Sequence, residues 1–312
     1  MLSRLAAIAP RGSSLVARGL RAKTSVVVGG GCIGGLSAAW LLSSAQCAGE
    51  SDAAPAQPSL LQKCVAEAIG TGMIVAGGCG VVCALKYAGH PITPLGIGAA
   101  FGMSVTLAIY CTAGISGAHL NPAVTISLVT QGVMDAAEAG PYIAAQIFGG
   151  AVAAGLNLAM FGAGIAAFEA KEGLKRGAKG SCSVFAGAFG MIPNHAICSN
   201  PRALFVETVI TGFLVFCIYG FTDPNNKVAD GAAPVLIGTT VAALVHIFAP
   251  VTGAGMNPAR DLGPRLVTLC TGWGGAALSS GWWVYTLGPI LGGILGGLAY
   301  SNTLGAGHKA GK

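Results

Sequence analysis

The sequence predicts an all-α membrane protein with six membrane-spanning helices and two half-length helices. Of its 312 residues, 53% are hydrophobic and only 9% are charged, against about 25% charged in a typical soluble domain. Six apolar stretches have the length of about 20 residues that crosses a bilayer. The tripeptide Asn-Pro-Ala occurs twice, each time at the start of a shorter apolar piece. A water-soluble fold could not cover this much apolar sequence with so few charged residues. We therefore expect the protein to lie in a lipid bilayer.

The spanning stretches follow one another with two interruptions. They lie at 61–85, 93–115, 141–165, 202–222, 233–252 and 281–300. The shorter pieces, 121–130 and 257–270, follow the second and the fifth stretch. Asn is a favoured helix N-cap and Pro is favoured at the first helical position, so each piece is predicted to begin a helix. A helix that starts at membrane depth is tolerated only where protein or a water-filled cavity satisfies its backbone.

The chain contains an internal repeat. "AEAIGTG" with Glu67 precedes Asn121, and "VETVITG" with Glu207 precedes Asn257 in the same order. Three spans per copy is an odd number, so the second copy enters the membrane inverted and the half helices meet head to head. We therefore expect a channel domain at 60–302 with the following parts: repeat one at 60–165, a linking loop at 166–200, and repeat two at 201–302, with a tail at 303–312.

The meeting point of the half helices predicts a pore for neutral solutes. Each half helix directs the positive end of its macrodipole, roughly half an elementary charge, at the membrane centre. Each Asn caps its helix with its oxygen, which leaves amide donors facing the gap. A site of this kind favours small solutes that accept hydrogen bonds and disfavours ions and protons. Arg260 follows one turn into the second half helix, and an arginine at this depth is normally functional.

Two long motifs carry a resemblance to a known family. "TAGISGAHLNPAVTISL" and "VTGAGMNPARDLGPRLV", together with "LGPILGG" in the last span, resemble the pore loops of the aquaporins, and most of all the glycerol-conducting aquaglyceroporins. The resemblance covers about 60–300 and implies an aquaporin-like right-handed bundle that conducts glycerol, small polyols and water as a homotetramer, with urea as a further candidate solute. The implied pore motif comprises Asn121, Pro122, Ala123, Asn257, Pro258 and Ala259.

The resemblance also implies a selectivity filter. Its four positions are Phe101, Val245, Ala254 and Arg260. A small apolar wall at Val245 and Ala254 favours glycerol, whereas water-selective members place a His in the filter. His246 lies one residue away, so a shift of register would make this a water-selective aquaporin, and that alternative stays open.

Five further positions bear on specificity in the family. Asp261, Arg265 and Phe161 match the residues typical of glycerol facilitators. Tyr285 and Thr286 do not, because glycerol channels usually carry Pro and an aliphatic residue there.

Glu67, Glu207 and His119 are interpreted as supports of the two pore loops. An ionisable group inside a membrane span also suggests a proton relay, but the same Glu in both halves favours loop support. His119 has no second ligand at metal spacing. We expect no metal, no cofactor and no enzymatic activity, and the absence of a basic stripe with interleaved aromatics argues against nucleic acid as a partner.

Other classes of function are weaker alternatives. A secondary transporter can also use inverted repeats and broken helices, but the spans offer no coupling-ion site. A scaffold or adhesion protein would show no permeability. Gly29, Gly31 and Gly34 fit a dinucleotide-binding pattern with Glu50 downstream, yet no second strand follows.

The N-terminal segment 1–59 is predicted to be a targeting or leader segment outside the channel. Residues 1–49 contain no acid, and they carry the basic residues Arg4, Arg11, Arg18, Arg21 and Lys23. This composition suits a mitochondrial or plastid presequence as well as a plasma-membrane protein with a basic tail. Cys182 and Cys198 share one polar loop and could pair only in an oxidising compartment.

Overall fold

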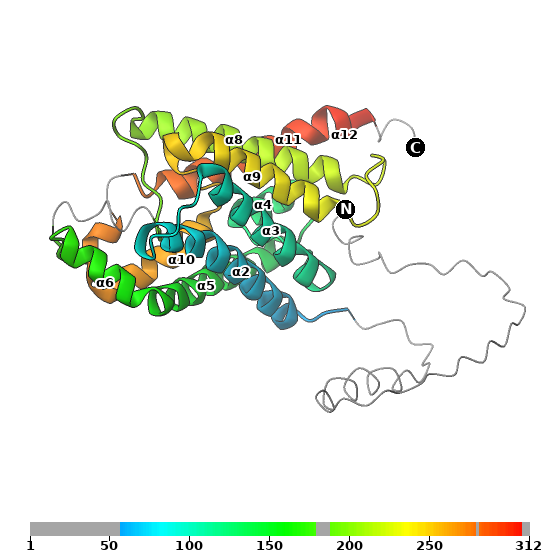
Figure 1. The fold of residues 1–312 in the computed structure, drawn as a ribbon. Coiled ribbons are helices and arrows are strands. Elements are labelled where there is room, and N and C mark those ends of the chain that lie inside the picture. The colour runs from blue at the N-terminus through cyan, green and yellow to red at the C-terminus, as the bar shows by residue number, and fades with distance from the viewer. Residues whose placement is uncertain (1–56, 179–187, 279–280, 308–312) are drawn as a thin grey trace, which may run out of the picture. The chain divides into compact units, whose positions relative to one another are not determined.

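The computed structural model describes residues 57–178, 188–278 and 281–307, and the regular secondary structure in these ranges is helical. Six of these helices are long and apolar enough to cross a membrane: α2 (Leu60–Tyr87), α3 (Pro94–Ser116), α5 (Ala136–Met160), α8 (Asn200–Thr222), α9 (Ala233–Thr252) and α11 (Val284–Asn302). Two shorter helices, α4 (Pro122–Thr130) and α10 (Pro258–Thr268), begin at the two Asn-Pro-Ala motifs. The predicted fold class is confirmed (Figure 1).

The third spanning helix differs from its predicted range of 141–165. It begins at Ala136 because the side chain of Asp135 caps it by accepting the N–H of Ala137. Pro141 therefore lies inside the helix, at the cost of one hydrogen bond. The helix ends at Met160, and α6 (Gly162–Lys171) follows after a break at Phe161. The segment 166–200, predicted as a loop, thus begins as helix.

Two further elements in the second half of the chain differ from their predicted ranges. α10 ends at Thr268, and a π-helical turn, η2 (Leu269–Trp273), and a 3-10 turn, η3 (Gly274–Leu278), lead toward α11. A short helix, α12 (Leu304–Gly307), lies in the predicted tail. The predicted leader 1–59 lies outside the described residues except at its last three positions.

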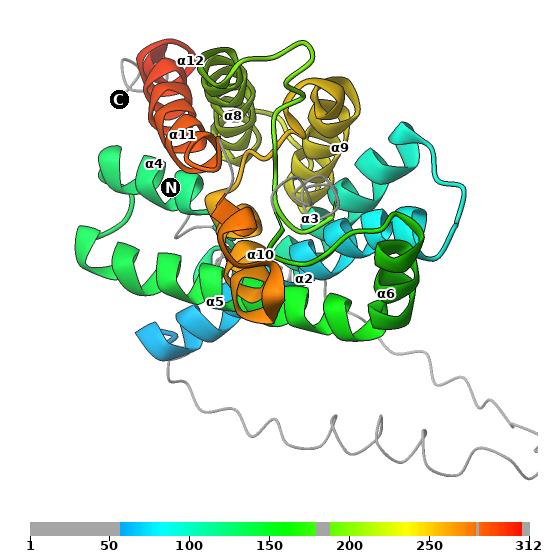
Figure 2. The same cartoon turned by 90° about the vertical axis from the view of Figure 1, so that its left-hand side faces the viewer.

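The packing of the first repeat recurs in the second. α2 packs on α5 and α3, and α8 packs on α11 and α9 in the same way, while α3 and α9 pack on each other. Each half helix packs on the last spanning helix of the other repeat, α10 on α5 and α4 on α11. Figure 2 shows α10 between α5 and the pair α8 and α11. Because each half helix packs on the other repeat, the N-termini of the two half helices meet at one point.

Glycine allows the closest helix crossings. A Cβ built on Gly102 of α3 would lie 2.3 Å from the carbonyl oxygen of Gly238 on α9, and one built on Gly238 would lie 2.4 Å from that of Gly102. A Cβ built on Gly149 of α5 would likewise overlap the carbonyl oxygen of Ala68, and one built on Gly292 of α11 would overlap that of Thr208. Small residues let membrane helices approach to backbone contact, which explains much of the chain's content of 50 glycines.

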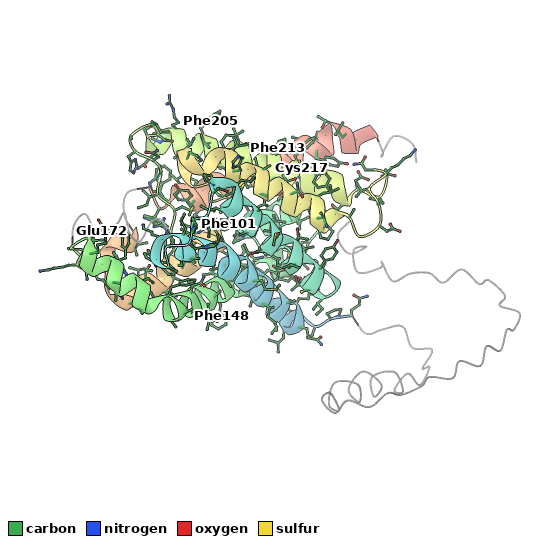
Figure 3. All side chains as sticks on the ribbon, in the orientation of Figure 1. Phe101, Phe148, Glu172, Phe205, Phe213 and Cys217 are labelled. Carbon is green, nitrogen blue, oxygen red and sulfur yellow. The ribbon has the colours of Figure 1, made fainter. Side chains whose placement is uncertain are left out.

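Large apolar side chains cover the outer faces of the spanning helices. Phe148 on α5 is 66% exposed and Phe205 on α8 is 68% exposed, and both point away from the bundle, whereas Phe101 lies inside it (Figure 3). A lipid environment accepts such a surface and water does not. The chain is an integral multi-pass membrane protein.

Candidate functional site

Two irregular loops lead into the half helices. In the first, Ala118 and Leu120 have φ of 50° and 54°, and in the second, Ala254 and Met256 have φ of 53° and 51°. Positive φ is costly for residues other than glycine, and such a conformation persists only when its surroundings determine it. The interactions that hold these two loops in place are therefore part of the site.

Glu67 of α2 holds the first loop. Its buried carboxylate accepts the backbone N–H groups of His119 at 2.9 Å and Leu120 at 2.6 Å. It also accepts the hydroxyl of Ser116 at 2.6 Å and the amide of Gln146 at 2.7 Å. Backbone donors that the loop cannot satisfy itself are thus satisfied by one carboxylate.

Glu207 of α8 holds the second loop in the same geometry. It accepts the N–H groups of Gly255 at 3.0 Å and Met256 at 2.9 Å, and the hydroxyl of Thr252 at 2.7 Å. Every bond that Glu67 accepts has a counterpart at Glu207 except the bond from Gln146. Both carboxylates are committed to loop support, which argues against a proton relay through them.

His119 is part of the same framework. Its Nδ1 lies 3.2 Å from the hydroxyl oxygen of Thr125, and its ring lies 5.0 Å from the ring of Tyr142, measured between centroids. The side chain therefore braces the first loop against α4 and α5.

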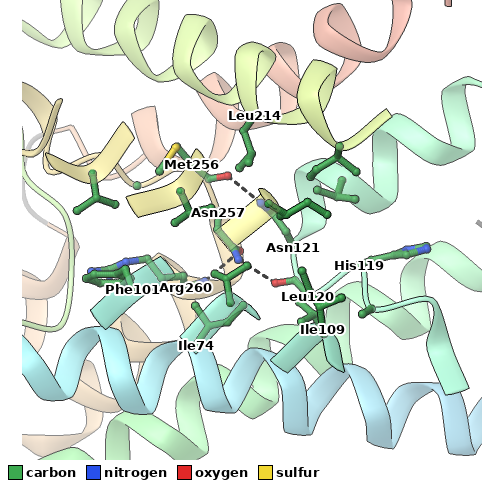
Figure 4. A pocket seen from close by; sticks show the side chains of 18 of the residues that line it. Ile74, Phe101, Ile109, His119, Leu120, Asn121, Leu214, Met256, Asn257 and Arg260 are labelled. Carbon is green, nitrogen blue, oxygen red and sulfur yellow. Dashed lines mark hydrogen bonds between the residues drawn. The ribbon is translucent and has the colours of Figure 1, made fainter. Parts of the chain in front are cut away.

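Asn121 and Asn257 cap the half helices and join them. The side-chain oxygen of Asn121 accepts the N–H of Ala123, and that of Asn257 accepts the N–H groups of Ala259 and Arg260. The amide of Asn121 donates to the carbonyl of Met256 at 2.9 Å, and that of Asn257 donates to the carbonyl of Leu120 at 2.8 Å (Figure 4).

These reciprocal bonds alter the expectation that the amide donors face only the gap. Each amide carries two N–H groups, and one of them crosses to the opposite loop. The remaining N–H of each Asn is available to a solute. Pro122 and Pro258 occupy the first helical positions, where their missing N–H groups cost nothing, and Ala123 and Ala259 follow fully buried.

A cavity lies beside the two Asn residues, and the lining of this channel combines apolar and polar groups. Its apolar wall includes Ile74, Val105, Ile109, Leu214, Ile218 and Val241. Its polar side is formed by the two loops, both Asn residues and Arg260. No carboxylate is among the described residues that line it.

The four predicted filter residues come together in this channel. Phe101, Val245, Ala254 and Arg260 all line it, and three of them also line a wider vestibule beyond, with Lys86 and Asn194. The guanidinium carbon of Arg260 lies 5.0 Å from the ring centroid of Phe101, within cation–π range. Arg260 is 3% exposed, and its Nη1 has no hydrogen-bond partner among the described residues, so that donor is free for a solute.

The register of α9 puts Val245 in the channel and His246 outside it. Val245 is 4% exposed and lines the pore, whereas His246 is exposed on the outer side of the helix. The water-selective alternative requires His246 in the filter, and this helix register places it elsewhere.

Asp261 and Arg265 lie behind the channel. Asp261 accepts the N–H of Met191 at 2.7 Å and the Nε–H of Arg265 at 2.6 Å, and both side chains are buried. Arg265 also donates to the carbonyls of Ala277 and Met191. The pair thereby fixes residue Met191 of the vestibule to the half helix that carries Arg260.

Phe161, Tyr285 and Thr286 do not line the channel. Phe161 sits at the break between α5 and α6, where it packs in an apolar cluster. Tyr285 is fully buried behind the second loop and donates to the carbonyl of Thr252 at 2.5 Å. The departure of Tyr285 and Thr286 from the glycerol-type pattern therefore does not change the channel lining.

Sequence reasoning missed Gln146, Tyr142, Ser116 and Met191. Tyr142 precedes Gly149-Gly150 by the same spacing as Tyr285 precedes Gly292-Gly293, and this repeat could have identified it. Met191 lies in the linking segment, which has no counterpart in the first repeat. The sequence left open whether Cys182 pairs with Cys198, and Cys182 lies outside the described ranges.

Comparisons with known proteins agree with this geometry. A model of the major intrinsic protein family matches residues 55–300. The glycerol uptake facilitator of Escherichia coli is 40% identical over 253 residues, which cover 79% of this chain and 89% of that protein. A propanediol uptake facilitator of Citrobacter freundii is 39% identical over 256 residues, covering 79% and 93%. The fold is similar to that of the Plasmodium falciparum aquaglyceroporin, with a TM-score of 0.69 and 23% identity over 79% of this chain and 97% of that one.

The loop-supporting carboxylates generate a prediction about stability. Glu67→Gln or Glu207→Gln turns an acceptor into an amide donor that faces backbone N–H groups, at an expected cost of about 1–3 kcal/mol for each donor left unsatisfied. The measurement is the apparent unfolding temperature of the purified protein in detergent. Glu138→Gln is the matched control, since it breaks only the partly exposed pair with Lys63, worth about 0–1 kcal/mol. Equal losses in all three variants would contradict the assigned roles.

Proposed function

The chain belongs to the major intrinsic protein family, and from this premise we propose that it is a passive channel for glycerol, other small polyols and water. It is a transport protein and not an enzyme. The observation that carries the proposal is the filter, in which a wall of Phe101, Val245 and Ala254 faces the donors of Arg260. A polyol has carbon atoms on one side and hydroxyl groups on the other, and such a filter complements both.

The central part of the channel supports exclusion of ions. Both half helices direct their positive ends to Asn121 and Asn257. Arg260 adds a positive charge, and the described lining offers a cation no carboxylate that could replace its hydration shell. Protons meet the same barrier.

The relatives' names support the choice of solute. They describe facilitators of glycerol and of propanediol uptake, both small linear polyols. The apolar residue at position 245 fits a carbon backbone, whereas a histidine there would narrow the bore and compete for hydrogen bonds. We extend the proposal to urea, which is of similar size and polarity.

Assembly and location are part of the proposal. We propose a homotetramer in which every subunit carries its own pore, consistent with the exposed apolar faces of the spanning helices. The channel domain comprises 60–302, and the segment 1–59, whose first 49 residues contain no acid and carry four arginines, directs it to a membrane. That membrane is the plasma membrane or that of a mitochondrion or plastid.

Stopped-flow swelling of proteoliposomes tests the proposal. Glycerol and water permeability above that of empty liposomes is expected, with no dependence on an H⁺ or Na⁺ gradient. Water permeability without glycerol permeability would contradict the polyol assignment. Dependence on either ion gradient would favour a secondary transporter, and no permeability to any solute would favour a scaffold.

The filter generates a prediction about solute size. Val245→His and Ala254→Phe should each cut glycerol permeability by about tenfold or more, a barrier increase of about 1.4 kcal/mol, and water permeability less. Both changes narrow the bore, and Val245→His also replaces apolar wall with a polar ring. His246→Val is the matched control on the next residue, and it should leave both permeabilities unchanged. Loss of selectivity in the control variant would place His246 in the filter and reverse the assignment.

Arg260 generates a prediction about ion exclusion. Arg260→Ala removes the filter's positive charge while the half-helix dipoles remain. We expect neutral solute flux to persist and proton or cation leak to rise above that of wild-type vesicles, measured with a pH-sensitive dye under an imposed potential. Arg176→Ala is the control, because that side chain pairs with Glu169 away from the channel. Leak at background in both variants would assign ion exclusion to the dipoles alone.

A further inference from the structure

Two tyrosines hold the ends of the two pore loops in symmetry-related positions. The hydroxyl of Tyr142 on α5 donates to the carbonyl of Ser116 at 3.0 Å, and that of Tyr285 on α11 donates to the carbonyl of Thr252 at 2.5 Å. Both accepting residues end their helices, α3 and α9, where carbonyls lack intrahelical partners. Both rings are buried, Tyr142 at 2% and Tyr285 at 0% exposure.

The residues that accept these bonds also begin the loop framework. The hydroxyls of Ser116 and Thr252 donate to Glu67 and Glu207, and they accept the N–H groups of Ala118 and Ala254. A glycine with φ of 83° or 89° follows each of them. Each tyrosine thus fixes the carbonyl from which its loop departs.

The two loops differ in what they carry. The second loop holds the filter residue Ala254 and leads directly to Arg260, whereas none of the four filter residues lies in the first loop. The ring of Tyr285 also lies directly on the second loop, since a Cβ built on Gly255 would be 2.6 Å from its Cδ1. In the first loop, the ring of Tyr142 instead contacts the side chain of His119.

We propose that Tyr285 is a positioning residue for solute selectivity, which holds the second loop so that Ala254 and Arg260 keep the spacing a polyol requires. It acts through the loop and does not touch the solute. This inference rests on the proposed function as a polyol channel. Glycerol must align its hydroxyl groups with the donors of Arg260, whereas water needs less alignment, so loosening of the loop affects glycerol more.

The symmetry of the two tyrosines supplies the experiment. Tyr285→Phe and Tyr142→Phe each remove one hydroxyl from an equally buried site, and glycerol and water permeabilities are measured in proteoliposomes and normalised to folded protein. Tyr285→Phe is expected to lower the ratio of glycerol to water permeability by roughly two- to tenfold, the equivalent of one net hydrogen bond. Tyr142→Phe is expected to keep the wild-type ratio, whatever its effect on total flux.

The outcomes separate this inference from the proposed function. A wild-type ratio in Tyr285→Phe, or the same fall in both variants, overturns the positioning role. Absence of glycerol flux in the wild-type protein overturns the polyol channel itself. If Tyr285→Phe does not yield folded protein, Gly255→Ala displaces the same ring from the opposite side and is expected to lower the ratio. An unchanged ratio in that variant overturns the role as well.

Discussion

The structure depends on one constraint, that backbone groups at membrane depth must find partners within the protein. The chain departs from continuous helix twice in its interior, at the loops that precede Asn121 and Asn257. Glu67 and Glu207 satisfy the loop N–H groups, and the Asn amides satisfy one carbonyl of the opposite loop. A polar strip of backbone can therefore line a pore that is otherwise apolar. Since each Asn bonds to the other repeat, neither half completes the pore alone.

The two halves share a backbone and differ in side chains where solutes are selected. Thr125 and Asp261 stand at the same place after their Asn residues. Thr125 contacts His119 and Gln146 within its own repeat. Asp261 instead holds Met191 of the linking segment and pairs with Arg265. The second repeat thus carries both the filter arginine and the attachment of the vestibule wall. In the proposed function, selectivity is consequently concentrated at one mouth of a nearly symmetric pore.

Local chemistry allowed the sequence to predict the spanning helices and the Asn caps, because hydropathy and capping depend on neighbouring residues. The start of α5 was predicted wrongly because Pro141 resembles a first helical residue, while the Asp135 cap that decides it lies further upstream. The bonds from Asn121 to Met256 and from Asn257 to Leu120 join different repeats, so no local pattern contains them. The family pattern relates the residue at position 285 only to solute preference and does not indicate that Tyr285 contacts the second loop. Its contact with Thr252 depends on how α11 packs on the loop, which its position in the chain does not reveal.

The same bonds explain why a channel fits this architecture better than a coupled transporter does. Alternating access needs an element with two arrangements of similar free energy. Movement of the first loop would break the hydrogen bonds that Glu67 accepts from His119 and Leu120, and no water would replace the lost acceptor. Apart from Glu138 in the first turn of α5, the only carboxylates in the six spanning helices are Glu67 and Glu207, and both are committed to the loops. A coupling ion would therefore find no uncommitted carboxylate among Glu67 and Glu207. The framework that makes an irregular backbone tolerable also holds it in one arrangement, so the solute gradient supplies the driving force for transit.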